Sequence, residues 1–165
     1  AEWQGKSGLL PYGDFMMMID DYVGKINQAL IAAGIDQNTL VIFTSDNGPA
    51  PAVGFDKLVE MGHLPSANFR GHKADIFEGG HRVPFIAKWP AKIKAGSVRA
   101  ETISLVDFFA TAASIADYSV SDSEGEDSYS ITSLFDIKNK EVIPLLPDNE
   151  GIINHCSIEI NETTQ

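Results

Sequence analysis

Residues 40–49, Leu-Val-Ile-Phe-Thr-Ser-Asp-Asn-Gly-Pro, form an apolar run that is followed at once by polar turn residues. The run has the length and composition of a buried strand, the kind found inside parallel sheets. Ligand sites in such sheets form just beyond the carboxyl ends of the strands. Asp46 and Asn47 would place two hard oxygen ligands there, which suit Ca²⁺ or Mg²⁺. Asn47-Gly48 is also a strong hairpin signal, so this stretch alone leaves both a metal site and a plain turn open.

The segments around this run predict α/β architecture. Residues 14–33 carry apolar side chains at spacings of three and four, which indicates a helix, and Gly34 follows where a C-terminal cap is expected. Residues 83–87 read as a second short buried strand, with Pro84 at its start or at an edge. Residues 103–117 have the pattern of a second helix. A helix that feeds a strand through a short link is half of an α/β unit.

Two further local signals refine this pattern. Ser104 and Asp107 have the spacing of a capping box at the start of the second helix. Residues 48–69 contain three prolines and little periodicity, which predicts a long loop. Long loops inside compact domains are often functional.

The composition indicates a globular chain and narrows the classes of partner. The chain has 165 residues, of which 44% are hydrophobic and 21% charged, and its net charge is −11. This acidity argues against non-specific binding to nucleic acid and against electrostatic binding to anionic membranes. An anionic substrate stays open, because a local Lys or Arg can act against the net field. No apolar run reaches the 18 residues of a membrane span, and a single cysteine excludes an internal disulfide.

A second informative stretch covers residues 69–85, Phe-Arg-Gly-His-Lys-Ala-Asp-Ile-Phe-Glu-Gly-Gly-His-Arg-Val-Pro-Phe. Glycines here permit positive φ and a close approach of backbone to a ligand. Cationic side chains can hold an anion, Arg through its fork and Lys as a point charge. A turn stabilised by salt bridges fits the same residues. The charged and imidazole side chains are Arg70, His72, Lys73, Asp75, Glu78, His81 and Arg82.

Together, the two stretches resemble the sulfatases that use a formylglycine nucleophile, the arylsulfatase-like group. The resemblance extends to Tyr12-Gly13-Asp14 and to residues 20–24, which lead into the first strand. It also includes residues 104–111, Ser-Leu-Val-Asp-Phe-Phe-Ala-Thr, in the second helix. The match covers about residues 9–117 in the family's order.

The resemblance implies a partial fold of the sulfatase and alkaline-phosphatase type, with a mainly parallel sheet flanked by helices and an incomplete carboxyl-terminal subdomain. Residues 1–117 would be the carboxyl-side part of the large α/β domain. Residues 118–165 would be a linker and the start of the smaller carboxyl-terminal domain. Within that segment we expect a helical turn near Leu134 and a strand at residues 156–160.

The resemblance also assigns roles to individual residues. Asp46 and Asn47 would be calcium ligands, and Lys73 would contact the sulfate and offset charge as the S–O bond breaks. A second group would build the turn and its ion pairs: Glu78, Gly79, Gly80 and Arg82. A third group would reach the substrate or lie behind the residues that touch it: His63, Arg70, His72 and His81.

One family motif is absent from this sequence. The nucleophile lies in a Cys-or-Ser, any residue, Pro, any residue, Arg pattern, and no such pattern occurs here. Cys156 is followed by Ser157 and Ile158, so we predict a buried structural thiol there instead. Calcium takes about six to eight oxygen ligands, and two are identified. We therefore expect a carboxyl-side fragment with weak metal affinity and no turnover by itself, since formylglycine would lie in the missing segment.

The expected parent activity is hydrolysis of a sulfate ester in a sulfated small molecule or polysaccharide. One alternative is a phosphate-ester hydrolase of the same superfamily, and another is a non-catalytic α/β module that binds an anion or a protein. An incomplete sheet would leave a strand edge open, so a homodimer is expected. The resemblance implies a periplasmic or extracellular location, and we expect neither nucleic acid nor membrane as a partner.

Overall fold

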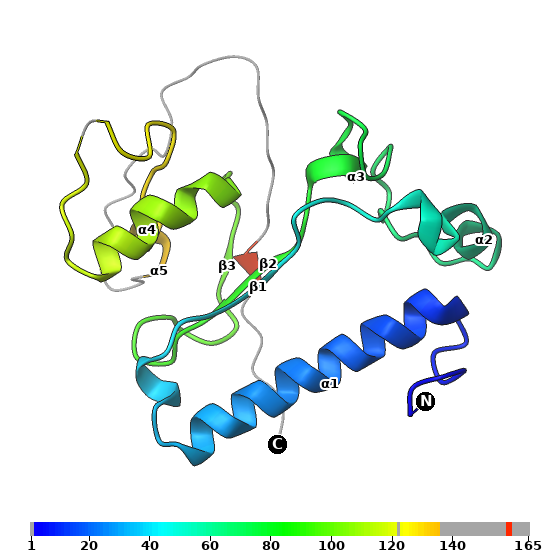
Figure 1. Cartoon of the computed structure of the whole chain (residues 1–165), viewed down its shortest axis with the longest axis horizontal. Helices are drawn as coiled ribbons and strands as arrows, with labels where there is room; N and C mark the ends of the chain where they lie inside the picture. The colour runs from blue at the N-terminus through cyan, green and yellow to red at the C-terminus, as the bar shows by residue number, and fades with distance from the viewer. Residues whose placement is uncertain (1, 122, 136–157, 160–165) are drawn as a thin grey trace. The chain divides into compact units, whose positions relative to one another are not determined.

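The computed structural model describes residues 2–121, 123–135 and 158–159 (Figure 1). The chain forms two compact units. The first unit combines residues 1–39 with residues 47–83, and the second combines residues 40–46 with residues 84–165. Within the described residues, no helix is both long enough and apolar enough to cross a bilayer.

The first unit begins with the long helix α1, Leu10–Ala32, drawn in blue in Figure 1. This confirms the predicted helix, which starts one turn earlier than expected because Pro11 suits the first turn of a helix. Gly34, with a φ of 68°, ends the helix as predicted. Its N–H donates to Ile31 O at 2.9 Å, and the N–H of Ile35 donates to Leu30 O at 3.1 Å. These two bonds form a Schellman motif, and the short 3₁₀ helix η1, Asp36–Asn38, follows.

The chain before α1 is held by one carboxylate. Asp14 accepts hydrogen bonds from the N–H of Gly5 at 2.6 Å, the N–H of Ser7 at 2.9 Å and the Oγ of Ser7 at 2.8 Å. The hydrogen bond from the Ser7 backbone, followed by that from Gly5, holds the pKa of Asp14 below its ordinary value of 3.8. The ionised carboxylate is therefore the form that orders residues 5–7.

The rest of the first unit contains more helix than the sequence indicated. It comprises η2, Pro51–Val53, then α2, Phe55–Glu60, and finally the single turn α3, Glu78–His81. The prediction of a continuous loop over residues 48–69 was wrong at η2 and α2. Only Leu58 of α2 is fully buried, so this six-residue helix leaves almost no apolar periodicity to detect.

The second unit is built on a small sheet. Strands β1, Val41–Thr44, and β2, Phe85–Lys88, pair in antiparallel fashion, with Val41 opposite Lys88 and Thr44 opposite Phe85. Strand β4, Ile158–Glu159, lies parallel to β2 and antiparallel to β3, Val98–Arg99. The order is β1-β2-β4-β3.

The α/β class is confirmed, but the expectation of a mainly parallel sheet was wrong for the described strands. Two of the three strand pairs are antiparallel. A short apolar run indicates that a strand is buried. It does not indicate whether the neighbouring strand is parallel or antiparallel.

The helices of the second unit confirm two local predictions. The predicted second helix consists of η3, Leu105–Asp107, and α4, Phe108–Ile115, and the predicted turn near Leu134 is α5, Thr132–Phe135. The capping box is present. The N–H of Ser104 donates to Asp107 Oδ2 at 2.8 Å, and Asp107 Oδ1 accepts from the N–H of Tyr129 at 3.0 Å. Asp107 thus ties the start of α4 to the chain that precedes α5.

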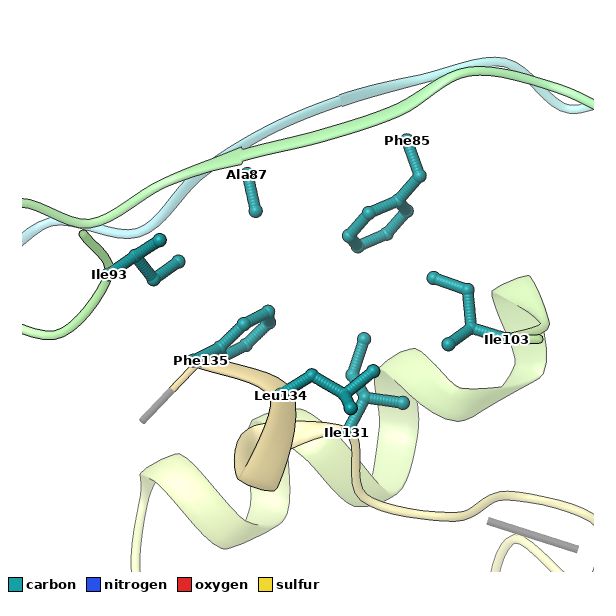
Figure 2. Packing of buried hydrophobic residues seen from close by; sticks show 7 residues of the cluster. All are labelled: Phe85, Ala87, Ile93, Ile103, Ile131, Leu134 and Phe135. Carbon is teal, nitrogen blue, oxygen red and sulfur yellow. The ribbon is translucent and has the colours of Figure 1, made fainter. Parts of the chain in front are cut away.

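The core of this unit lies between β2 and the helical segments (Figure 2). Phe85 and Ile131 are fully buried, and the ring of Phe85 lies 5.5 Å from that of Phe108, centroid to centroid. Thr111 Oγ1 accepts from the N–H of Ile131 at 3.1 Å, so the core also satisfies this buried backbone donor. The buried cluster consists of Phe85, Ala87, Ile93, Ile103, Ile131, Leu134 and Phe135.

Two sequence predictions concern residues that the structure does not describe. Cys156 lies outside the described residues, as do both ends of the predicted strand at 156–160. The division between residues 1–117 and 118–165 refers to the domains of a longer protein and stays a prediction.

Replacement of Ile131 by Ala should destabilise the second unit. Removing a fully buried Ile side chain typically costs about 2–5 kcal/mol, because transfer energy is lost and a cavity remains. Urea unfolding followed by tryptophan fluorescence measures the change. Ile115→Ala is the matched control, since Ile115 is 41% exposed and its loss should cost much less. Equal losses for the two variants would contradict the assigned core.

The order of residues 5–7 should depend on pH through Asp14. Because folding lowers the pKa of Asp14, its contribution is present above about pH 3.8 and is lost as pH falls through the lower folded value. Amide hydrogen exchange at Gly5 and Ser7 should accelerate over that range relative to α1. In Asp14→Asn the protection should be low at every pH, whereas Asp20→Asn, an exposed change in the same helix, should resemble wild type.

Candidate functional site

Two segments of the first unit that the sequence singled out lie side by side. The N–H of Gly48 donates to Gly80 O at 2.9 Å, and the N–H of Lys73 donates to Pro49 O at 2.9 Å. We call residues 47–49 and 70–82 the paired loops. The second hydrogen bond pairs the backbone of Lys73 with Pro49, which follows Asn47 by two positions. The structure thus brings a predicted metal segment and the predicted sulfate segment together.

Glycine allows close backbone contact both between the paired loops and within residues 70–82. A Cβ added to Gly48 would collide with the carbonyl oxygen of Gly79, and one added to Gly79 would collide with that of Gly71. A Cβ on Gly80 would collide with the carbonyl oxygen of Asp75. Backbone atoms cannot swing aside as a side chain can, so only glycine fits at these positions. Gly48, Gly79 and Gly80 are accordingly buried.

The turn α3 is closed by an ion pair. Arg82 Nη1 lies 3.2 Å from Glu78 Oε2, and the N–H of Arg82 donates to Glu78 O at 2.8 Å. The Arg82 guanidinium also lies over the ring of Phe69, 4.3 Å from its centroid. His81 Nε2 is 3.0 Å from the carbonyl oxygen of Ile76 and must be the protonated nitrogen in that contact. The buried Nδ1 of His81 has no hydrogen-bond partner among the described residues.

The residues predicted to meet metal and sulfate have different surroundings. Asp46 is exposed and follows the last residue of β1, Thr44, by two positions. Asn47 is half-buried, and its Nδ2 donates to Gly48 O at 2.8 Å, which orients the side-chain amide. Lys73 is exposed. Its neighbour Ala74 has a φ of 78°, a strained value for a residue with a Cβ, and such strain concentrates at functional sites.

Two acceptor oxygens and an aromatic ring hold the ring of His72. Its Nδ1 lies 3.0 Å from Lys73 O and 3.3 Å from Asp75 Oδ2, and its backbone N–H donates to the same Asp75 oxygen at 3.0 Å. The ring also meets the ring of Phe55 edge-on, with the centroids 5.5 Å apart. The imidazole beside Lys73 is therefore held from three directions.

A pocket of about 440 Å³ opens between α2 and the loop that follows it. Arg70 and His72 line it, whereas His63, just after α2, and Lys73 are not among the lining residues. The sequence did not reveal this pocket, because its apolar walls come from a segment without periodicity. The lining residues are Phe55, Val59, Leu64, Ser66, Ala67, Phe69, Arg70, Gly71, His72, Asp75 and Phe77.

The donor set fits a hard cation only in part. Asp46 and Asn47 offer a carboxylate and an amide oxygen, the ligand types that Ca²⁺ prefers. Among the described residues, no group of three or more His, Cys, Asp or Glu side chains could hold a metal ion. Two ligands of about six to eight are thus identified, and the roles of all these residues stay predictions.

Comparison with known proteins places these features in context. The family model described as Sulfatase matches residues 3–118. An N-acetylgalactosamine-6-O-sulfatase of Bacteroides thetaiotaomicron is 41% identical over 114 residues, which are 67% of this chain and 22% of that protein. The mouse N-acetylgalactosamine-6-sulfatase is 44% identical over 107 residues, 64% of this chain and 19% of that protein. The chain thus spans about a fifth of the length of these relatives.

Two further matches agree with these. Mouse steryl-sulfatase is 40% identical over 105 residues, which cover 64% of this chain and 17% of that protein. A solved structure from a study of glycosaminoglycan metabolism by Bacteroides thetaiotaomicron superposes with a TM-score of 0.72 at 34% identity. It covers 81% of this chain and 28% of its own chain.

The glycine contacts predict opposite effects for two Gly-to-Ala changes. Gly80→Ala places a methyl group against the Asp75 carbonyl and should cost about 1–3 kcal/mol or more. Gly24→Ala, in the middle of α1 with open space around it, should stabilise by about 0.5–1 kcal/mol. Urea unfolding measures both. A Gly80→Ala variant as stable as wild type would show that the backbone within residues 70–82 is not closely packed.

Proposed function

We propose that this chain, which belongs to the sulfatase family, carries the sulfate-contacting lysine and two metal ligands of an enzyme that hydrolyses sulfate esters. The observation that supports this most directly is the hydrogen bond from the N–H of Lys73 to Pro49 O. It holds the lysine beside the loop that begins with Asn47. A cation held near a hard oxygen ligand such as Asn47, within one unit, suits an anionic substrate bound with a divalent metal.

The substrate class we propose is N-acetylgalactosamine sulfated at its 6-hydroxyl, within a glycosaminoglycan. Support comes from the relatives named for this activity in a bacterium and in several mammals. Two of these relatives are 41% and 44% identical over matched stretches of 114 and 107 residues. Since this chain spans about a fifth of their length, substrate choice also depends on segments outside it.

In the proposed mechanism Lys73 acts through its charge. Its exposed ammonium group would donate to a sulfate oxygen and offset the negative charge that builds up as the S–O bond breaks. Asp46 and Asn47 would hold the metal, which when bound would add positive charge on the sulfate. The glycine contacts and the Glu78–Arg82 ion pair would keep the loop of Lys73 in place, so that little reorganisation is needed during the reaction.

The isolated 165-residue chain is proposed to be inactive. It has no Cys-or-Ser, any residue, Pro, any residue, Arg pattern to supply the nucleophile, and two metal ligands give weak affinity for calcium. A periplasmic or extracellular location, and pairing between copies through open strand edges, stay predictions.

The proposed function can be tested on a full-length protein that contains this sequence. Lys73→Ala should lower kcat/KM for N-acetylgalactosamine 6-sulfate by about 10²–10³-fold, the usual effect of removing one group that stabilises transition-state charge. Lys94→Ala, also an exposed lysine, is the control and should retain wild-type activity. Sulfate release is measured by ion chromatography.

Two outcomes would contradict the proposal. One is a Lys73→Ala enzyme that hydrolyses the sulfate ester as fast as wild type. The other is a wild-type enzyme that cleaves the matching phosphate ester faster than the sulfate ester. Asp46→Ala should also weaken calcium binding, measured by calorimetry, because it removes a charged ligand.

A further inference from the structure

The pocket beside the paired loops has the size and lining of a ligand site. Its volume of about 440 Å³ lies in the range of small-molecule sites, which are mostly apolar with a few polar groups. Four of its apolar side chains stay more than a third exposed, so their surface is available to a ligand: Val59, Leu64, Phe69 and Phe77. The polar groups are contributed chiefly by Arg70, His72 and Asp75.

Arg70 presents a charged group that the protein itself does not neutralise. Its guanidinium lies over the ring of Phe77, 3.7 Å from the centroid. Stacking occupies one face of the guanidinium. Its N–H donors lie in the plane of the group and therefore stay available to a ligand. Among the described residues, no carboxylate forms an ion pair with Arg70. The stacked fork is therefore preorganised for a planar anion such as a carboxylate.

His72, which lines the pocket, carries a potential hydrogen-bond acceptor. Its Nδ1 faces two oxygens that can only accept, Lys73 O at 3.0 Å and Asp75 Oδ2 at 3.3 Å. Nδ1 must therefore carry the proton, which in the neutral ring leaves Nε2 as a hydrogen-bond acceptor. The Asp75 carboxylate is engaged by the ring and by the N–H of His72, at 3.0 Å. The natural partner of an imidazole acceptor is a hydroxyl group.

We propose that this pocket binds a uronic acid unit, the neighbour of the sulfated sugar along the glycan chain. Arg70 pairs with its carboxylate, His72 Nε2 accepts from a ring hydroxyl, and the apolar walls cover the C–H faces of the ring. Because His72 directly precedes Lys73, a glycan bound at both places would run from the pocket toward the sulfate contact. This inference rests on the proposed function, which it deepens by naming the second sugar.

Binding of an unsulfated disaccharide of glucuronic acid and N-acetylgalactosamine tests the pocket alone. NMR titration of the 165-residue chain should show tighter binding of this acid than of its uncharged methyl ester. Arg70→Gln should weaken binding of the acid by about tenfold, the effect of losing one charge-assisted interaction, and should leave the ester nearly unchanged. Lys94→Gln is the matched control, since it removes an exposed cation remote in sequence.

The comparison of the acid with its methyl ester uses wild-type protein, so it does not depend on the folding of a variant. Equal affinity for acid and ester, or equal weakening by Arg70→Gln and Lys94→Gln, would overturn the pocket assignment. A second probe, the monosaccharide N-acetylgalactosamine 6-sulfate, separates this result from the proposed function. If Lys73→Ala does not weaken that probe, the sulfate contact fails whatever the pocket does. If only the acid-to-ester preference is missing, the pocket fails and the sulfate contact stands.

Discussion

The close contact of backbone against backbone in the paired loops is the constraint on which the site depends. Gly48, Gly71, Gly79 and Gly80 lie where a side chain would collide with a neighbouring carbonyl or leave the backbone strained. Without a Cβ at these positions, the hydrogen bonds of Gly48 and Lys73 to the opposite loop can form at 2.9 Å. A loop that is anchored in this way can present Lys73 and the strained Ala74 in a fixed position. Arg70 and His72, which line the pocket, are carried by the same loop.

Positive charge is concentrated in the paired loops. The chain as a whole is strongly acidic, with a net charge of −11, yet Arg70, Lys73 and Arg82 lie within 13 positions of one another. The three cations have different surroundings. Arg82 is paired with Glu78 and closes the α3 turn, whereas Arg70 is stacked on Phe77 and Lys73 is exposed. A local concentration of positive charge lets an acidic protein attract an anionic ligand. The paired Arg82 supports the loop, whereas Arg70 and Lys73 are available to an anionic ligand.

The sequence indicated those features that depend on local chemistry. The end of α1 at Gly34 and the capping box of Ser104 and Asp107 follow from backbone groups that need partners at helix ends, so their residue types were sufficient. The turn at α5 was likewise visible. Strand direction was not, because an apolar run is the same in parallel and antiparallel pairs. Helix α2 and the pocket were missed because their apolar residues, such as Phe55 and Leu64, pack locally without a repeating pattern. The motifs located the paired loops, but only the structure showed that glycine contacts join them.

In the proposed enzyme, the paired loops would place the ammonium group of Lys73 at a bound sulfate. A crystal structure of a full-length protein containing this sequence, with calcium and N-acetylgalactosamine 6-sulfate bound, tests this most directly. The account predicts Lys73 Nζ within about 2.7–3.2 Å of a sulfate oxygen, with Asp46 and Asn47 on the metal and the hydrogen bond from Lys73 to Pro49 intact. A sulfate group bound elsewhere, with Lys73 Nζ directed into solvent, would contradict it.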